Sequence, residues 1–323
     1  MSSLCVNVHL APSSRRESLS RDVLAGLTAP DKSLPPIWFY DAYGSILFDE
    51  ITRLAEYYPT RAERSILAAH ADDIAMAAGC DTLVELGSGT SEKTTLLLDA
   101  LTRTGELQRF VPFDVSEEVL LQASTSISES YGIDVVAVVG DFHHHLGEIP
   151  RDGRRLIAFL GGTIGNLDPR SRRRFLANLD ASMDYDDRLL LGVDLVKDPA
   201  RLVAAYDDCS GVTASFNRNV LAVINSDLDA DFDLATFDHV ALWNAAEQWI
   251  EMRLRSRVDQ RVRIRALDLE VHFEAGEDIL TEISAKFTRD GIEAELWQCG
   301  FVLEEAWTDP EGDFLLTMSR PYC

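Results

Sequence analysis

The sequence predicts an α/β fold built on a parallel sheet with helices on both faces. Three observations support this prediction. Short apolar runs alternate with helix-forming stretches, the runs are continuously apolar, and most of them end in glycine or aspartate. Strands of this kind are buried on both faces, as in doubly wound parallel sheets.

The expected elements follow one another in a regular order. Strands are predicted at 83–86, 109–113, 135–139, 156–160 and 188–193, and helices at 93–101, 116–130, 169–182 and 199–208. Ligands of such sheets bind outside the carboxyl ends of the strands. The residues that follow the strands are therefore the first candidates for a functional site.

The first strand leads into the sequence LVELGSGTSEKT, residues 83–94. Its glycine turn precedes a helix, and such a junction presents free backbone N–H groups to a nucleotide-like ligand. A P-loop and a dinucleotide-binding G-x-G-x-x-G motif would both need glycine where Glu92 stands, so both are disfavoured. The remaining E-x-G-x-G turn is a weak signal by itself, since such a turn can be purely structural.

Later strand ends carry further candidates. Asp114 follows the second strand, where an acid can bind ribose hydroxyls, and Asp141 and Phe142 follow the third. Asn166 follows the fourth strand, where the reacting group of a doubly wound fold should lie. Together these positions are expected to hold a ribose, an adenine and a reacting group.

This set of strand ends resembles that of the class I S-adenosylmethionine-dependent methyltransferases, which have a Rossmann-like sheet. Longer stretches narrow the resemblance to the histidine-specific N-alpha-methyltransferases of ergothioneine biosynthesis. They are KSLPPIWFYDAYGSILFDEITRLAEYYPTRAE, TLVELGSGTSEKT, FLGGTIGNL, LLLGVDLVKD, AYDDCSGVTASFNRNVL and LTEISAKF. The similarity extends from about residue 24 to residue 319 and is highly specific, unlike the glycine turn alone.

The resemblance implies an enzyme that trimethylates the α-amino group of L-histidine to hercynine with S-adenosylmethionine as methyl donor. It implies no metal. The cofactor-binding positions that it implies are Tyr40, Gly87, Lys93, Asp114, Asp141 and Phe142. The implied substrate-binding positions are Tyr57, Asn166, Tyr206, Met252, Glu282 and Ser284, and Tyr40 is the candidate catalytic contact for the amine.

Several of these residues also have a plain structural interpretation. Glu282 and Ser284 alternate with apolar residues, so on a strand they share one face, and the pattern alone favours an exposed edge. The resemblance instead implies that they bind both nitrogens of the substrate imidazole. From the pattern alone, Asn166 and Tyr206 could be a satisfied amide and a core phenol, and Met252 ordinary core.

The strand–helix alternation starts and stops within the chain, which predicts two domains. A methyltransferase domain is expected at 62–196, and 1–61 with 197–323 are expected to form a discontinuous α+β substrate-binding domain. Residues 252–258 and 262–265 alternate strictly around 259–261, which predicts an antiparallel hairpin. The arginines of this hairpin are interpreted as a solvated face.

Composition excludes several classes of function. Thirty basic and 54 acidic residues give a net charge of −24, which repels nucleic acid. No apolar run approaches a membrane span or a signal-peptide core, so we expect a cytoplasmic protein, and we expect a monomer. The five cysteines lack a C-x-x-C pair and are expected to be reduced thiols. The run 143–145 of three histidines is interpreted as a solvated loop.

Three alternatives remain open at this point. A relative of the same family acting on a different amine would keep the cofactor motifs without needing Glu282 and Ser284. An NAD-type oxidoreductase could use Asp114 for the ribose, but the third glycine of its motif is missing at Glu92. A regulatory protein that only binds the cofactor is the third.

Overall fold

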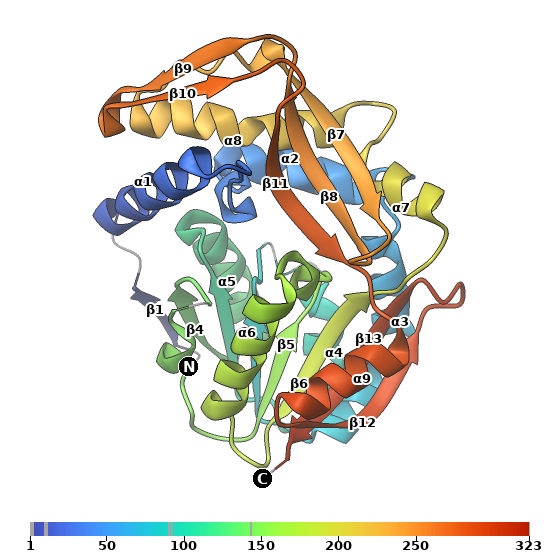
Figure 1. Ribbon diagram of the computed structural model, residues 1–323. Helices are drawn as coiled ribbons and strands as arrows, with labels where there is room; N and C mark the ends of the chain where they lie inside the picture. The colour runs from blue at the N-terminus through green and yellow to red at the C-terminus, as the bar shows by residue number, and fades with distance from the viewer. Residues whose placement is uncertain (1–2, 10–11, 90, 92, 143, 323) are drawn as a thin grey trace. The chain divides into compact units, whose positions relative to one another are not determined.

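The computed structural model describes residues 3–9, 12–89, 91, 93–142 and 144–322 (Figure 1). The chain divides into two compact units. The sheet unit comprises Met1–Leu10, Pro59–Val196 and Phe287–Cys323, and the second unit comprises Ala11–Tyr58 and Lys197–Lys286.

In the described part of the chain, the sheet unit holds an eight-stranded sheet in the order β1-β4-β3-β2-β5-β6-β13-β12. Its strands are β1 (Leu4–Val8), β2 (Thr82–Leu86), β3 (Arg109–Asp114), β4 (Asp134–Val139), β5 (Arg155–Phe159), β6 (Arg188–Asp194), β12 (Phe301–Thr308) and β13 (Phe314–Pro321). The pairs from β1 to β6 are parallel, whereas β13 runs antiparallel to both β6 and β12.

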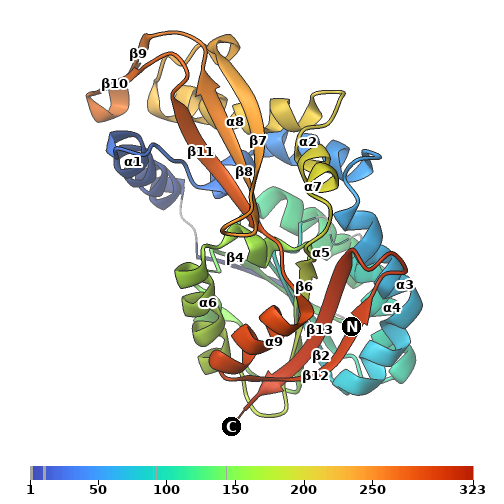
Figure 2. The same ribbon diagram turned by 45° about the vertical axis from the view of Figure 1, so that its right-hand side comes forward.

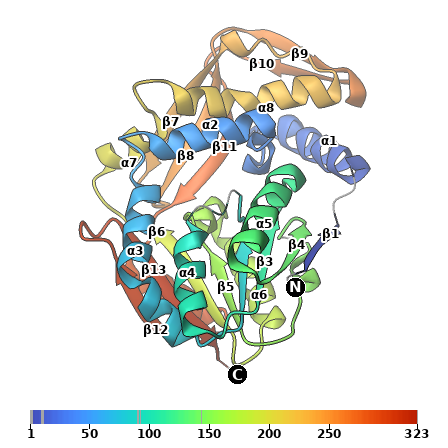
Figure 3. The same cartoon turned by 180° about the vertical axis from the view of Figure 1, so that it is seen from behind.

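Helices cover both faces of this sheet. Figures 1 and 3 show α6 and α9 over one face and α3, α4 and α5 over the other. The helices are α3 (Pro59–Ala78), α4 (Thr94–Thr104), α5 (Glu117–Tyr131), α6 (Pro169–Ser182) and α9 (Arg289–Gln298), with short 3-10 turns η2 (Leu146–Glu148) and η3 (Thr163–Asn166). Every residue of β2 and of β5 is buried, as their apolar runs predicted. The predicted doubly wound parallel sheet is confirmed.

The predicted boundaries of the sheet domain were too narrow. Residues 1–61 and 197–323 were all assigned to the other domain, yet β1, β12 and β13 belong to the sheet. The prediction failed because β6 has a neighbouring strand on each side, β5 and β13, so the sheet does not end with it. The strand β13 is apolar and follows residues 197–286 in the sequence.

The second unit combines helices with antiparallel strands (Figure 2). Its elements are α1 (Pro12–Thr28), η1 (Pro36–Phe39), α2 (Ala42–Arg53), α7 (Pro199–Tyr206), α8 (Val212–Leu228), η4 (Leu234–Thr236), β7 (Phe237–Asn244), β8 (Trp249–Ser256), β9 (Gln260–Ile264), η5 (Arg265–Leu267), β10 (Leu269–Phe273) and β11 (Asp278–Ala285). Described residues form a three-stranded sheet, β11-β8-β7, and a two-stranded pair, β10-β9. Its own core includes Phe39, Leu221 and Phe237. This unit is discontinuous in sequence, and its limits differ from the predicted 1–61 and 197–323.

The predicted hairpin of 252–258 with 262–265 is wrong. Both segments are strands, but β8 pairs with β7 and β11, while β9 pairs with β10. Strict alternation identifies a strand and its faces but not its partner. Several arginines of these strands are ion-paired, for example Arg261 with Glu270 at 2.9 Å and Arg255 with Asp278 at 2.7 Å. These pairings agree with a solvated face.

No described helix is both long enough and apolar enough to cross a lipid bilayer.

Candidate active site

The glycine turn after β2 is a left-handed backbone segment with open space beside it. Gly87 and Gly89 have φ values of +70° and +49°. Apart from the glycines' own chain neighbours, no heavy atom of the described residues lies within 4 Å of the position that a Cβ would take at either glycine. The Gly87 N–H donates to the Phe113 carbonyl oxygen at 2.8 Å, which ties the turn to the end of β3. The turn can therefore accept a ligand against its backbone.

Asp114 lies at the end of β3, beside this turn. Its Oδ2 accepts the Gly89 N–H at 2.9 Å, and its Oδ1 accepts the Ser116 N–H at 2.9 Å. Asp114 keeps a partly exposed surface, yet desolvation raises its pKa, and the two N–H groups oppose that rise only in part. The two backbone bonds hold the carboxylate in place at the strand end, where its remaining lone pairs can accept hydroxyl groups.

An acidic residue of β2 lies buried just before the turn. Glu85 is 4% exposed, and the Thr94 hydroxyl donates to its Oε1. Its Oε2 is buried and has no hydrogen-bond partner among the described residues. Burial raises the pKa of Glu85 to about 8, although the Thr94 bond and the charge of Lys93 lower it. A buried carboxylate oxygen without a partner indicates a place where a ligand or water supplies one.

Lys93 is held by a second buried acid. Its Nζ forms an ion pair with Glu63 of α3, which is fully buried. The Glu63 Oε1 also accepts the N–H of Gly161, in the loop after β5, at 2.7 Å. Glu63 thus links α3, the start of α4 and this loop. Sequence reasoning missed Glu63, Glu85 and Thr94, although all three lie in the quoted stretches that carry the resemblance.

The remaining predicted residues of the sheet unit follow β4 and β5. The Asp141 carbonyl oxygen accepts the N–H groups of His144 and His145, each at 2.9 Å. The Phe142 ring packs edge-on against Phe159 and Phe175, with ring centroids 5.4 and 5.5 Å away. Asn166 ends η3 and is half-buried.

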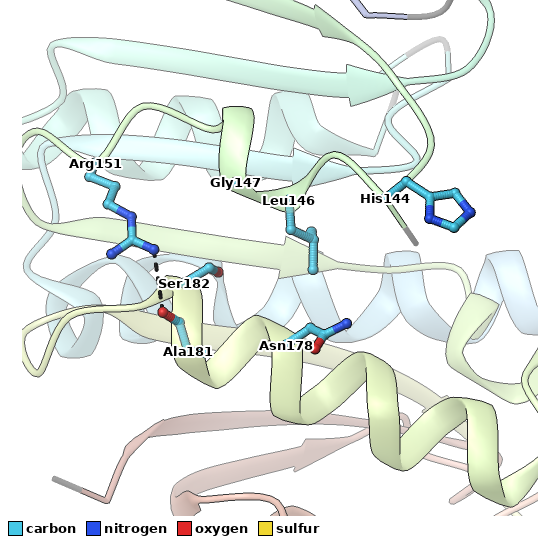
Figure 4. Close-up of a pocket in the computed structure, with 7 residues that line it drawn as sticks. All are labelled: His144, Leu146, Gly147, Arg151, Asn178, Ala181 and Ser182. Atoms are coloured by element: carbon cyan, nitrogen blue, oxygen red, sulfur yellow. Dashed lines mark hydrogen bonds between the residues drawn. The ribbon is translucent and has the colours of Figure 1, made fainter. Parts of the chain in front are cut away.

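A separate surface hollow of about 300 Å³ lies near η2 and the end of α6 (Figure 4). It is lined by His144, Leu146, Gly147, Arg151, Asn178, Ala181 and Ser182. Arg151 donates to the Ala181 carbonyl oxygen at 3.3 Å. None of these residues belongs to the predicted cofactor or substrate sets.

In the second unit, the predicted imidazole-binding residues lie on one buried face of β11. Glu282 is 9% exposed and Ser284 is also buried, which overturns the interpretation as an exposed edge. Glu282 is paired across the sheet with Met252 of β8, which is buried as well. Burial raises the pKa of Glu282 to about 7, and the charge of Lys286 opposes this rise.

Tyr206, the last residue of α7, meets this face. Its Oη lies 2.7 Å from the Ser284 Oγ. Its carbonyl oxygen accepts a hydrogen bond from His239 Nε2 at 2.7 Å, which places the ring proton of His239 on that nitrogen. Burial lowers the pKa of His239, so the ring is neutral and its Nδ1 accepts from the Asn217 amide at 2.8 Å. His239 thereby fixes the end of α7 against β7.

Aromatic rings of the second unit form a continuous cluster. Tyr40 packs edge-on against Phe48 and Phe216, with centroid distances of 5.5 and 5.4 Å. Tyr57 joins the cluster through Phe48 at 6.4 Å and reaches Tyr206 at 6.2 Å. Phe216 was not predicted as a site residue, although it lies in the stretch AYDDCSGVTASFNRNVL.

The predicted residues thus fall into two sets, one in each unit. The sheet unit carries Gly87, Lys93, Asp114, Asp141, Phe142 and Asn166, and the second unit carries Tyr40, Tyr57, Tyr206, Met252, Glu282 and Ser284. Among the residues that the structure describes, no cluster of three or more potential ligands could hold a metal ion. Glu92 and His143 lie outside the described residues, while His144 is exposed.

A doubly wound sheet with an E-x-G-x-G turn after its central strand β2 and an acid at the end of β3 defines a nucleotide-binding α/β protein of the Rossmann-like class. Residues 19–321 match the model of the histidine-specific, S-adenosylmethionine-dependent methyltransferases, so the chain belongs to this family. It is therefore a methyltransferase that uses S-adenosylmethionine, and the predicted methyltransferase fold is confirmed.

Curated relatives agree with this assignment. The histidine N-alpha-methyltransferase of Mycolicibacterium smegmatis is 59% identical over 312 residues, which cover 96% of this chain and 97% of that protein. The protein of the same name from Mycobacterium tuberculosis is 58% identical with the same coverage. Ergothioneine biosynthesis protein 1 of Schizosaccharomyces pombe is 34% identical over 60% of this chain and 26% of its own length.

A solved methyltransferase from Clostridium acetobutylicum aligns with 87% of this chain and 99% of its own, at 9% identity and a TM-score of 0.49.

Proposed function

We propose that this protein transfers three methyl groups from S-adenosylmethionine to the α-amino nitrogen of L-histidine, which yields hercynine as the first step of ergothioneine biosynthesis. Two relatives of 58–59% identity are named histidine N-alpha-methyltransferase, and a more distant one is named for ergothioneine biosynthesis. The observation that carries the proposal is the buried polar face of Glu282 and Ser284 on β11.

Glu282 and Ser284 are assigned to the imidazole ring of the substrate. A neutral imidazole has one N–H donor and one acceptor nitrogen, and a carboxylate with a hydroxyl can satisfy both. An amino acid without these ring nitrogens would leave the buried carboxylate unpaired, and such a loss strongly disfavours a wrong substrate. Met252, opposite Glu282, contributes the apolar wall of this pocket.

Asn166 and Tyr206 are assigned to the carboxylate of the amino acid, and Tyr57 to its amino end. An amide N–H₂ such as that of Asn166 donates hydrogen bonds, which is the chemistry a carboxylate requires, and the assignment of Tyr206 follows the family resemblance.

The residues of the sheet unit fit S-adenosylmethionine, which supplies an electrophilic methyl group on its sulfonium when bound. Gly87 and Gly89 leave their backbone open, and Asp114 offers oriented lone pairs for ribose hydroxyls. The Glu85 Oε2, which has no hydrogen-bond partner among the described residues, can form one more hydrogen bond. We assign Gly87, Lys93, Asp114, Asp141, Phe142 and Tyr40 to this cofactor. Lys93 is assigned to the cofactor although its Nζ is also ion-paired with Glu63.

The chain's own residues have two chemical tasks. Each methylation begins from an uncharged amine, so a proton must leave the nitrogen before each transfer, and the product carries none. A free α-amino group has a pKa of roughly 8, so positioning and proton acceptance both matter at neutral pH. We assign the contact with the amine to Tyr40.

The aromatic cluster of Tyr40, Phe48, Tyr57 and Phe216 is assigned to the amine nitrogen of the substrate as it gains methyl groups and becomes a quaternary ammonium. Aromatic faces attract a quaternary ammonium with roughly 0.5 to 2 kcal/mol. The cluster therefore favours retention of the methylated amine until the third methyl group has been added.

The test is incubation of the purified protein with S-adenosylmethionine and an equimolar mixture of the common amino acids, with mass spectrometry of every product. Selective formation of trimethylated histidine is the expected result. If histidine stays unmodified while another amine is methylated, the assignment of Glu282 and Ser284 is wrong and the alternative of a different amine holds. A cytoplasmic, monomeric protein stays a prediction, whose oligomeric part light scattering on the purified protein would test.

A further inference from the structure

Lys286 is buried beside the polar face of β11, although no sequence pattern singled it out. It follows the last residue of the strand and is 3% exposed. Its Nζ donates hydrogen bonds to the Ser284 Oγ and to the Tyr206 Oη, both at 2.9 Å. Because these two oxygens are themselves 2.7 Å apart, the three groups form a closed triangle.

The donors and acceptors of this triangle can be counted. An ammonium group has three donors and no acceptor, so both hydroxyl oxygens accept from Lys286. A serine hydroxyl has two acceptor sites and one hydrogen. When Tyr206 donates its hydrogen to Ser284, Lys286 and Tyr206 together occupy both acceptor sites of the Ser284 oxygen. The hydrogen of Ser284 is then its remaining means of binding a ligand.

We propose, on the basis of the function proposed above, that Lys286 is a positioning residue that makes Ser284 a hydrogen-bond donor and thereby selects a substrate imidazole in its neutral form. Ser284 donates to the unprotonated ring nitrogen, and the carboxylate of Glu282 accepts the N–H of the other. An imidazolium has no acceptor nitrogen for Ser284, and the buried positive charge of Lys286 repels it. The arrangement therefore fixes both the protonation state and the tautomer of the ring.

The charge of Lys286 acts on Glu282 in the same sense. Glu282 lies in β11 and Lys286 just after the end of this strand, four positions further along the chain. The charge of Lys286 favours the ionised carboxylate of Glu282 against the effect of burial. An ionised carboxylate is purely an acceptor, which complements a donating Ser284. One lysine thus sets the hydrogen-bonding role of both residues that are assigned to the imidazole.

The test is steady-state kinetics of Lys286→Met and Lys286→Arg with histidine as the varied substrate. Methionine keeps much of the length and removes the charge and donors, whereas arginine keeps both. We expect Lys286→Met to raise the histidine KM about ten-fold or more, which corresponds to the loss of an oriented hydrogen bond. The kcat should change less, the affinity for S-adenosylhomocysteine should stay near that of the wild type, and Lys286→Arg should restore part of the KM.

A double-mutant cycle separates this role from a structural one. If Lys286 acts through Ser284, Lys286→Met should add little to the KM of Ser284→Ala, because the hydroxyl it orients is gone. Independent effects on KM in the double variant, or a wild-type KM in folded Lys286→Met, would overturn the inference. Should Lys286→Met fail to fold, Lys286→Arg with its altered donor geometry takes its place in the same cycle. A wild-type protein that does not methylate histidine would instead defeat the proposed function itself.

Discussion

Glu282 of β11 lies directly opposite Met252 of β8 in an antiparallel pair, and both side chains are buried. Residues paired in this way have Cβ atoms roughly 5 Å apart. The carboxylate is thus accompanied by a side chain that offers no strong hydrogen bond, which agrees with the rise of its pKa to about 7. A group that ionises near neutrality is well suited to respond to the substrate bound beside it.

Replacement of Glu282 by alanine tests the role of this carboxylate. We expect the histidine KM to rise by about 10- to 100-fold, because a hydrogen bond to a charged group contributes roughly 1.5 to 3 kcal/mol. Binding of S-adenosylhomocysteine, measured by calorimetry, should change little. Equal losses of histidine and cofactor binding would show that the change acts on the fold and not on the substrate pocket.

The pKa of Glu282 predicts a pH dependence of histidine binding. Its carboxylate accepts a hydrogen bond only when ionised, so binding should weaken as the pH falls through about 7. The histidine KM should be measured between pH 6 and 8 for the wild type and for Glu282→Gln. Because the substrate titrates identically with both proteins, the wild type should show a steeper rise of KM toward low pH. Parallel pH profiles would exclude Glu282 as the titrating group.

Glu85 predicts a pH dependence of stability without ligand. Its pKa is raised from 4.5 to about 8 by burial, so between these values the folded chain holds a proton that the unfolded chain has released. The free energy of unfolding should therefore fall as the pH rises, by at most about 1.4 kcal/mol per pH unit from this group. Chemical denaturation at pH 5 and pH 8 should reveal a smaller decline for Glu85→Gln than for the wild type. An identical decline in both proteins would contradict the buried, protonated state of Glu85.

Replacement of Phe216 should change the ratio of dimethylated to trimethylated histidine. Phe216→Leu removes an aromatic face that packs against Tyr40 and Phe48 but keeps an apolar side chain. If the cluster stabilises the methylated amine, dimethylhistidine should accumulate several-fold more before the trimethylated product appears, in line with a cation–π contribution of roughly 0.5 to 2 kcal/mol. Mass spectrometry of a time course measures this ratio. Leu242→Ala, at an exposed position of β7, provides the control and should leave the ratio unchanged.

The central sheet could be predicted because its signals are local. Each strand from β2 to β6 is a short apolar run followed by a glycine, an acid or a turn, and all five were located. The sheet's last two strands could not be assigned, because β13 pairs with β6 across a long stretch of chain that leaves no local trace. The same limit explains the wrong hairpin, since alternation shows that β8 and β9 are strands but not that each has another partner.

Part of the candidate active site could also be predicted from local signals. Gly87 and Asp114 stand at strand ends, where any parallel sheet binds its ligands, so position alone singled them out. The roles of Glu282 and Ser284 could be predicted only from the family resemblance. The alternating pattern alone favours an exposed polar face, because a sequence does not show that such a face is buried. Lys286 and Glu63 escaped notice because a lysine or glutamate in sequence gives no sign that it is buried, and their meaning arises from contacts with distant residues.

The late arrival of β13 has a consequence for synthesis of the protein. Until residues 314–321 leave the ribosome, β6 is the edge of an unfinished sheet, with the apolar residues Leu189, Leu190 and Leu191 beside unpaired backbone groups. Such an edge is a template for strands of other chains. Translation that stops before β13 should therefore give aggregates and not a smaller folded enzyme, and a chaperone that shields this edge would be needed longest during the synthesis of residues 197–313.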